Sequence, residues 1–223
     1  MEENIMQILR RLALTAGLTI VATTAQAAPY DWVDWTSYTA TTEVEGTLPG
    51  GNGVNFTGEW SGVITGAGPD YWAAIASAVT SAEVDNGPPA SDIIGLSGGP
   101  SSGTQTITFD SAVVDPVMAI FSLGQAAVTA TFDFEDDFDI LNDGSSVAGS
   151  SGLTELAGYV LEGAEGHGLI RFNGTFTSIS WTVPTYEYWA GFQIGVAVPA
   201  PASLPLFALA LAALAVGRRR ISA

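Results

Sequence analysis

Turn-forming residues punctuate this sequence at short intervals, and this spacing constrains the fold more than any other feature. The segments between them are short and rich in Thr, Val, Ile and Phe. Short β-branched and aromatic segments bounded by turn residues are typical of strands in β-sandwiches and barrels. We therefore expect an all-β domain over residues 28–197. The Gly, Asn, Asp and Pro clusters lie at residues 49–53, 66–70, 85–89, 98–103 and 142–144.

Several of these segments alternate apolar and polar side chains, as half-buried strands do. The segment Val117–Ser122 is apolar on both faces and therefore predicts a central strand. Residues 72–82 fit either a short helix or a loop. The pattern predicts a single antiparallel β-sandwich of jelly-roll type. The side chains expected to face its core are Ile107 and Phe109; Val128, Ala130, Phe132 and Phe134; Ile179, Trp181 and Val183; and Tyr188, Ala190, Phe192, Ile194 and Val196.

Acidic residues dominate the predicted domain. Residues 28–197 hold 21 Asp and Glu side chains against a single base, Arg171, and the whole chain has no Lys. Nucleic acids and anionic lipids are bound through basic patches, so we exclude both as partners. The excess of acids fits either a highly charged surface suited to saline water or specific binding of Ca²⁺.

The densest acidic cluster supplies the candidate calcium ligands Asp133, Glu135, Asp137 and Asp139. Carboxylate oxygens are the ligands that Ca²⁺ prefers. The spacing is not that of an EF-hand loop, because Leu141 stands where a ligand is needed. The alternative is a solvated strand edge whose charges prevent pairing with another chain.

Residues 1–27 have the pattern of a secretory signal peptide. We expect the mature chain to begin at Ala28 and the protein to be exported. The absence of cysteine is compatible with export, because a domain of this size folds without disulfides. The signal consists of a positive start, an apolar stretch and an A-x-A cleavage site, which are Arg10 and Arg11, residues 12–22, and Ala25 and Ala27.

Residues 198–223 also contain three parts in a fixed order. Two prolines hold the first part extended and separate it from the domain. The apolar run that follows has no polar face and predicts a membrane helix, although the 16 residues from Ala202 to Gly217 fall short of the ~20 of a usual span. Arginines end it and are expected on the cytoplasmic side. The parts are Val198, Pro199, Pro201 and Ala202; residues 204–216; and Arg218, Arg219 and Arg220.

This tail resembles the PEP-CTERM sorting signals of Gram-negative bacteria, most closely the VPLPA variety, with Ala200 in place of its Leu. The resemblance implies recognition by an exosortase-type membrane protease and cleavage near the prolines. It implies anchoring in the membrane through the C-terminal helix, and then delivery to the cell surface or to an extracellular matrix rich in exopolysaccharide. The segments Asp115–Ile120 and Glu165–Gly168 resemble uncharacterised exported domains that carry the same tail, which supports the predicted architecture.

Candidate catalytic groups are few. The one histidine, His167, lies near Glu165 and is interpreted either as a loop histidine or as a base or metal ligand. One His and no Cys cannot provide a usual zinc site. Glu162 and Glu165 are the nearest candidates for the carboxylate pair of a glycan hydrolase, although sequence spacing does not establish the distance that such a pair needs.

Alternation along the last predicted strand turns Trp189 and Gln193 away from the core. A flat tryptophan ring beside glycine, with an amide close by, predicts a surface for sugar rings. The alternative is that a loop such as 69–72 covers Trp189. Our leading hypothesis is a non-enzymatic surface or matrix domain in contact with polysaccharide, without a cofactor other than the candidate Ca²⁺. The alternative is an extracellular glycan hydrolase.

Overall fold

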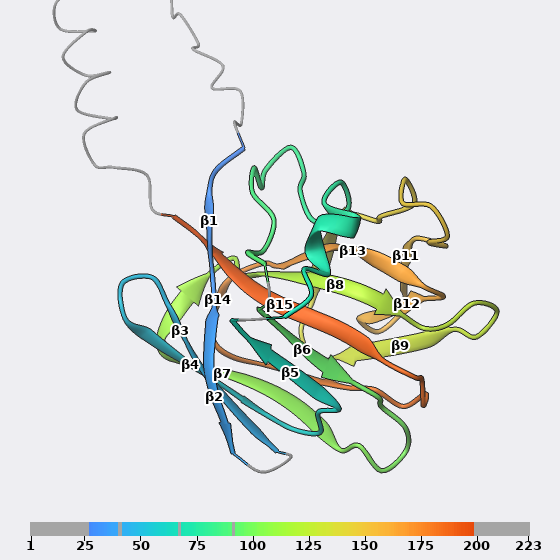
Figure 1. Cartoon of the computed structure of the whole chain (residues 1–223), viewed down its shortest axis with the longest axis horizontal. Helices are drawn as coiled ribbons and strands as arrows, with labels where there is room; N and C mark the ends of the chain where they lie inside the picture. Colours follow the sequence, from blue (N-terminus) through green and yellow to red (C-terminus); the bar gives the residue numbers. More distant parts are fainter. Residues whose placement is uncertain (1–26, 40–41, 67, 91, 199–223) are drawn as a thin grey trace, which may run out of the picture.

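The computed structural model describes residues 27–39, 42–66, 68–90 and 92–198. Strands dominate these residues and form two antiparallel sheets that face each other (Figure 1). The predicted signal peptide up to residue 26 and the predicted tail beyond Val198 lie outside the described residues. Within the described ranges, no helix is long and apolar enough to cross a membrane.

The first sheet has seven strands. Its central strands are apolar on both faces because both faces are covered. The order across the sheet is β10 (Phe138–Asn142), β13 (Gly166–Phe172), β8 (Val117–Leu123), β15 (Ala190–Ala197), β6 (Asp92–Leu96) and β5 (Gly62–Thr65), and β1 (Tyr30–Trp32) also pairs with β15.

The second sheet has eight strands, and its outer face is mostly polar. Its strands alternate buried and exposed side chains, as the sequence predicts. The order is β11 (Leu153–Leu156), β12 (Val160–Gly163), β9 (Ala130–Phe134), β14 (Thr175–Thr182), β7 (Thr104–Val114), β4 (Asn52–Thr57), β3 (Glu43–Leu48) and β2 (Asp34–Thr39).

The main core fills the space between the two sheets. Trp181 of the second sheet meets Phe192 of the first edge to face, with ring centroids 5.3 Å apart. Phe56 lies 5.3 Å from Phe192 and 6.1 Å from Trp181. Such aromatic contacts join the two layers and add to the burial of apolar surface. The predicted β-sandwich is therefore confirmed.

A second core covers the outer face of the seven-stranded sheet. The 3-10 helix η1 (Trp72–Ile75) and the chain after it lie against this face (Figure 1). In β8, Met118 faces the main core while Val117 and Ala119 face the second core. This double burial confirms that Val117–Ser122 belongs to a central strand.

Two predicted core positions are wrong. Val128 is 45% exposed and Tyr188 is 82% exposed. Ala127 has a φ of 68°, and Gln125 and Val128 exchange backbone hydrogen bonds in a tight turn. Strand β9 therefore begins only after this turn, and β15 begins after Tyr188, so alternation does not extend to either residue.

The two ends of the described chain lie together. Tyr30 pairs with Ala197, and the amide of Val198 donates a hydrogen bond of 3.0 Å to the carbonyl oxygen of Pro29. Strand β15 runs from the opposite end of the sandwich to this point (Figure 1). We call the end with the chain termini the tail end. We call the opposite end, with loops 58–61, 97–103 and 183–189, the distal end.

Candidate functional site

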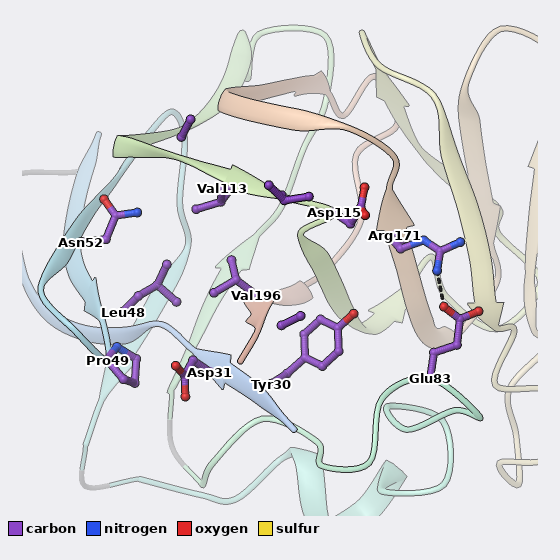
Figure 2. A pocket seen from close by; sticks show the side chains of 13 residues that line it. Tyr30, Asp31, Leu48, Pro49, Asn52, Glu83, Val113, Asp115, Arg171 and Val196 are labelled. Carbon is purple, nitrogen blue, oxygen red and sulfur yellow. Dashed lines mark hydrogen bonds and ion pairs between the residues drawn. The ribbon is translucent and has the colours of Figure 1, made fainter. Parts of the chain in front are cut away.

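A pocket of about 620 Å³ opens at the tail end. Figure 2 shows apolar side chains on one side, including Leu48, Val113 and Val196, and the polar groups of Arg171 and Glu83 on the other. Its walls come from both sheets, because β1 begins here, β15 and β7 end here, and the β3–β4 turn lies beside them. The residues that line it are Tyr30, Asp31, Leu48, Pro49, Asn52, Glu83, Ala112, Val113, Val114, Asp115, Arg171, Val196 and Ala197.

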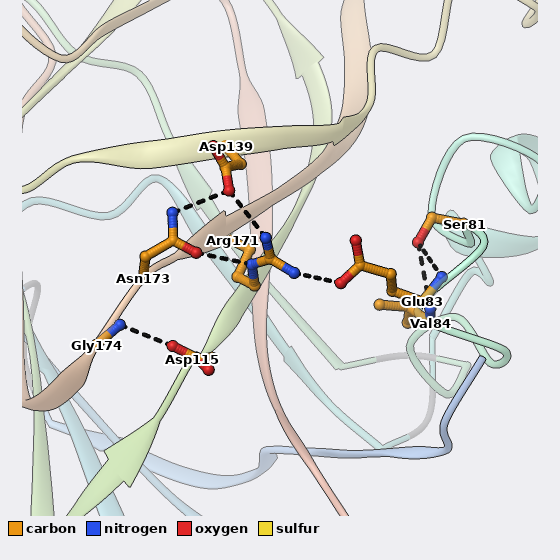
Figure 3. A network of polar contacts seen from close by, with 8 residues as sticks. All are labelled: Ser81, Glu83, Val84, Asp115, Asp139, Arg171, Asn173 and Gly174. Atoms are coloured by element: carbon orange, nitrogen blue, oxygen red, sulfur yellow. Dashed lines mark hydrogen bonds and ion pairs between the residues drawn. The ribbon is translucent and has the colours of Figure 1, made fainter. Parts of the chain in front are cut away.

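Arg171 organises the polar side of this pocket (Figure 3). Its guanidinium pairs with Glu83 and, at 2.8 Å, with Asp139. Its Nε donates to the side-chain oxygen of Asn173 at 2.9 Å, and the amide of Asn173 donates to Asp139 at 2.9 Å. The hydrogen bond from Asn173, and then that from Arg171, lower the pKa of Asp139 below its ordinary value. The guanidinium thus holds together segments from residues 83, 139 and 171–173.

The remaining charges at the pocket are negative. Asp115, with a φ of 47°, accepts the amide proton of Gly174 at 2.7 Å. Asp31 and Glu83 add two more carboxylates, while each of the three guanidinium nitrogens of Arg171 already donates one hydrogen bond to a side-chain oxygen. Burial raises the pKa of Tyr30 above its ordinary value of 10, and the protonated hydroxyl can donate a hydrogen bond. The pocket therefore suits a neutral group that carries hydroxyls better than an anion.

The predicted calcium ligands are distributed over both sheets. Asp133 lies on β9 of the eight-stranded sheet, and Asp139 lies on β10 of the seven-stranded sheet. Glu135 and Asp137 lie on the connection between them, and the carboxylate of Asp139 binds Arg171 and Asn173. Among the described residues there is no group of three or more His, Cys, Asp or Glu side chains that could hold a metal ion.

The expected sugar surface of Trp189 and Gln193 requires correction. Gln193 is fully buried, and its Nε2 donates to the carbonyl oxygens of Val33 at 2.9 Å and Asp92 at 3.1 Å. Trp189 is half-buried in the second core, with its ring 5.2 Å from Tyr71 and 5.8 Å from Phe121. Alternation correctly turns both side chains away from the main core, but a second layer covers that face. The covering segment includes Tyr71, which belongs to the loop 69–72 that was the alternative expectation for Trp189.

His167 lies on β13 and not in a loop. Its Nδ1 accepts the amide proton of Ser122 at 2.9 Å, so the neutral ring carries its proton on Nε2. Burial lowers the pKa of His167, and the ring packs edge to face on Phe121 at 4.8 Å. The hydroxyl of Ser122 donates to Glu165 at 2.6 Å, which leaves no pairing of that hydroxyl with the histidine. In this arrangement His167 is a hydrogen-bond acceptor that links β13 to β8.

The candidate carboxylate pair is divided between a strand and a turn. Glu162 lies on β12, where it pairs with Thr131 and Thr154 across the sheet. Glu165 lies in the following turn with a φ of 55° and holds Ser122, whose own φ is 57°. Such left-handed conformations in non-glycine residues carry strain. Here they accompany a hydrogen bond that ties the β12–β13 turn to β8.

Sequence reasoning missed two buried acids. Glu187 is fully buried, and one of its carboxylate oxygens has no hydrogen-bond partner. Burial raises its pKa to about 7, and burial together with Asp34 raises the pKa of Asp92 to about 6. Glu187 stands between two exposed tyrosines, so local pattern gives no sign of its burial. Asp92 is the first residue of the otherwise apolar strand β6, and this position in the sequence was the available signal.

Comparisons of this chain with protein-family models, curated proteins and solved structures find no match.

Proposed function

We propose that residues 28–197 form a non-enzymatic, exported domain that is held by one end at the cell surface or in the extracellular matrix and contacts polysaccharide. The observation that carries this proposal is the pairing of β1 with β15, which brings Ala28 and Val198 to the same end of the sandwich. A domain attached through that end has the whole distal end free. We also propose that the β-sandwich is of the jelly-roll type.

The predicted sorting tail begins where the last strand ends. Strand β15 stops at Ala197, and the prolines at 199 and 201 follow directly. A proline-rich segment is an extended spacer, which suits a connection between a folded domain and a membrane helix. The tail would first be held by the membrane and then be processed by an exosortase-type protease.

Charge and geometry favour binding over catalysis. A glycan hydrolase needs a carboxylic acid that stays protonated beside a second carboxylate in a cleft. The two carboxyl groups with a strongly raised pKa, Asp92 and Glu187, do not line the pocket at the tail end. Two of the carboxylates there accept from N–H donors, Glu83 from Arg171 and Asp115 from Gly174. These contacts support a binding domain over a hydrolase that uses Glu162 and Glu165.

The test is to incubate the full chain, solubilised in mild detergent, with exopolysaccharide from the producing cells. We expect co-sedimentation with the polysaccharide and no release of reducing ends. Release of reducing ends that Glu162→Gln or Glu165→Gln abolishes would establish the hydrolase instead. Failure to co-sediment would refute the proposed binding.

A further inference from the structure

Two tyrosines stand exposed on one loop at the distal end. Tyr186 is 66% exposed and Tyr188 is 82% exposed. The residue between them, Glu187, is fully buried. Its amide donates to the carbonyl oxygen of Ser97 at 2.8 Å, and its carboxylate accepts the amide proton of Gly124 at 2.5 Å. These two hydrogen bonds of Glu187 hold the loop in place while both tyrosine rings point outward. Binding a ligand to the rings would therefore cost little further conformational entropy.

A polar groove is lined in part by loop 97–103. Tyr186 lies next to this loop, since a Cβ added at Gly99 would be 3.4 Å from the Cβ of Tyr186. Ser102 donates its hydroxyl to the carbonyl oxygen of Gly99 at 2.9 Å. Ser102 also lines an open groove of about 580 Å³. The groove contains hydroxyl, carboxylate and indole groups from Thr42, Glu43, Thr57, Glu59, Trp60, Ser101 and Ser102.

Another exposed tyrosine extends the aromatic surface beside the groove. Tyr38 is 52% exposed, and its ring meets Trp60 edge to face at 5.2 Å. Loops 58–61 and 97–103 are joined to each other, because the carboxylate of Glu59 accepts the amide protons of Ser97 at 3.2 Å and Gly98 at 3.3 Å. Aromatic rings and polar groups therefore lie on several loops of the distal end, and hydrogen bonds hold the backbone of these loops.

We propose that this distal surface, made of Tyr186, Tyr188 and the groove at Trp60, binds a neutral polysaccharide chain. This inference rests on the proposed function and assigns its binding site. Sugar rings present C–H groups that pack on aromatic faces, while their hydroxyls bind side chains such as Ser102 and Glu43. Tyrosine suits this contact because it combines an apolar ring with a polar tip.

Charge decides which polysaccharide fits. The domain carries 21 carboxylates and one base, and Arg171 lies at the tail end and binds two of those carboxylates. The described residues therefore provide no basic side chain at the distal end for an acidic polymer. Like charges repel at an interface, so a polyanion is disfavoured and a neutral chain is not.

The experiment is native affinity electrophoresis of the full chain in detergent, through gels that contain hydroxyethylcellulose, galactomannan or polygalacturonate. We expect at least one neutral polymer to retard the protein and polygalacturonate to leave its mobility unchanged. The double variant Tyr186→Ala, Tyr188→Ala should weaken the retardation at least tenfold. Both side chains are exposed, so the variant should keep its melting temperature.

The matched control is Tyr159→Ala, which removes an exposed tyrosine in the β11–β12 turn and should leave retardation unchanged. Retardation by polygalacturonate alone, or by none of the polymers, would overturn the assignment of a neutral ligand. Equal retardation of the double variant and the wild type would overturn the assignment of the site. If the double variant still co-sediments with exopolysaccharide from the producing cells, the site is wrong and the proposed function remains. If the wild type does not co-sediment either, the proposed function fails.

Discussion

The backbone amide of Gly124 donates a 2.5 Å hydrogen bond to the carboxylate of Glu187, which is fully buried 63 positions further along the chain. This contact joins the β8–β9 turn to the loop before β15. It satisfies one carboxylate oxygen and leaves the other without a partner. Burial of a carboxyl group with incomplete hydrogen bonding disfavours its ionised form.

The first prediction concerns the pH dependence of stability. Burial raises the pKa of Glu187 from an ordinary 4.5 to about 7. Between these values the unfolded chain loses a proton that the folded chain keeps, so stability falls as pH rises. We expect the melting temperature to drop from pH 5 to pH 7. Glu187→Gln should show a smaller drop because glutamine does not titrate, and its amide oxygen can still accept the Gly124 proton. Thermal melts at several pH values measure this. An unchanged slope in Glu187→Gln would contradict it.

The control for this prediction is Asp92→Asn. Its pKa of about 6 gives a contribution of the same sign over a narrower range. The Asp92 variant should therefore flatten the curve mainly below pH 6, while Glu187→Gln flattens it up to pH 7. If both variants gave the same profile, the two buried acids would not be separate contributors.

The second prediction concerns Arg171. Replacement by Met leaves Glu83 and Asp139 without their cation and should lower the free energy of unfolding by about 1 kcal/mol, since half-exposed ion pairs contribute little each. Arg171→Lys keeps the charge but not the forked donor geometry. Its free energy of unfolding should lie between those of the wild type and Arg171→Met. Urea unfolding at neutral pH measures the difference. If Arg171→Met were as stable as the wild type, the ion pairs of Arg171 would contribute nothing measurable to stability.

The third prediction tests the second core. Trp189→Ala should cost about 3 kcal/mol, because it removes the ring that packs on Tyr71 and Phe121. A Cβ added at Gly95 would overlap Nε1 of Trp189, so Gly95→Ala should also destabilise the fold. Gly62 pairs directly with Gly95, and a Cβ there would lie 3.7 Å from the same atom. Gly62→Ala should therefore change stability little. Equal effects of the two alanines in urea unfolding would argue against this packing.

The fourth prediction concerns salt. Repulsion among 21 carboxylates and a single base in residues 28–197 should be reduced by screening, so NaCl should raise the melting temperature. CaCl₂ at matched ionic strength should give a similar rise. A clearly larger rise with CaCl₂ would reveal a specific ion site through mass action on the native state. Indifference to both salts would refute the charge argument.

The fifth prediction concerns processing of the chain ends. We expect the mature protein to begin at Ala28, whose amide nitrogen donates to the carbonyl oxygen of Glu83 at 2.9 Å, and to lack residues 204–223. The strands of the described residues all lie between these two ends. Intact-mass spectrometry of protein released from cells measures both ends. A mass that includes Arg218–Arg220 would contradict tail cleavage.

Local alternation predicted much of the main core. Phe132, Ile107 and Trp181 face it as expected, because a strand packed on one layer places every second side chain inward. The same rule failed at Val128 and Tyr188, where a turn ends the strand geometry. Turn boundaries depend on single backbone angles, such as the positive φ of Ala127. A positive φ at a residue other than glycine cannot be predicted from the local sequence.

The second core and the buried acids were not accessible to local patterns. Gln193 alternates as an outward residue, yet it is fully buried, and its Nε2 donates to the carbonyl oxygens of Val33 and Asp92. The indole of Trp72, from a third segment, donates to the same oxygen of Asp92. Glu187 is fully buried, and its carboxylate accepts the amide proton of Gly124 from a distant turn. Both depend on tertiary contacts between segments far apart in sequence. For the same reason the distal surface was missed, since its groove and tyrosines come from four separate segments.

The course of β15 has a mechanical consequence. The strand begins next to Tyr188 and Trp189 at the distal end and finishes one residue before the predicted tail. Tension between a polysaccharide held at the distal end and a C-terminus held at the cell surface would therefore run along this strand. Its backbone is paired with β8 on one side and with β6 and β1 on the other, by hydrogen bonds that lie across the direction of pull. A force in that direction loads these bonds together in shear, and does not open them one after another.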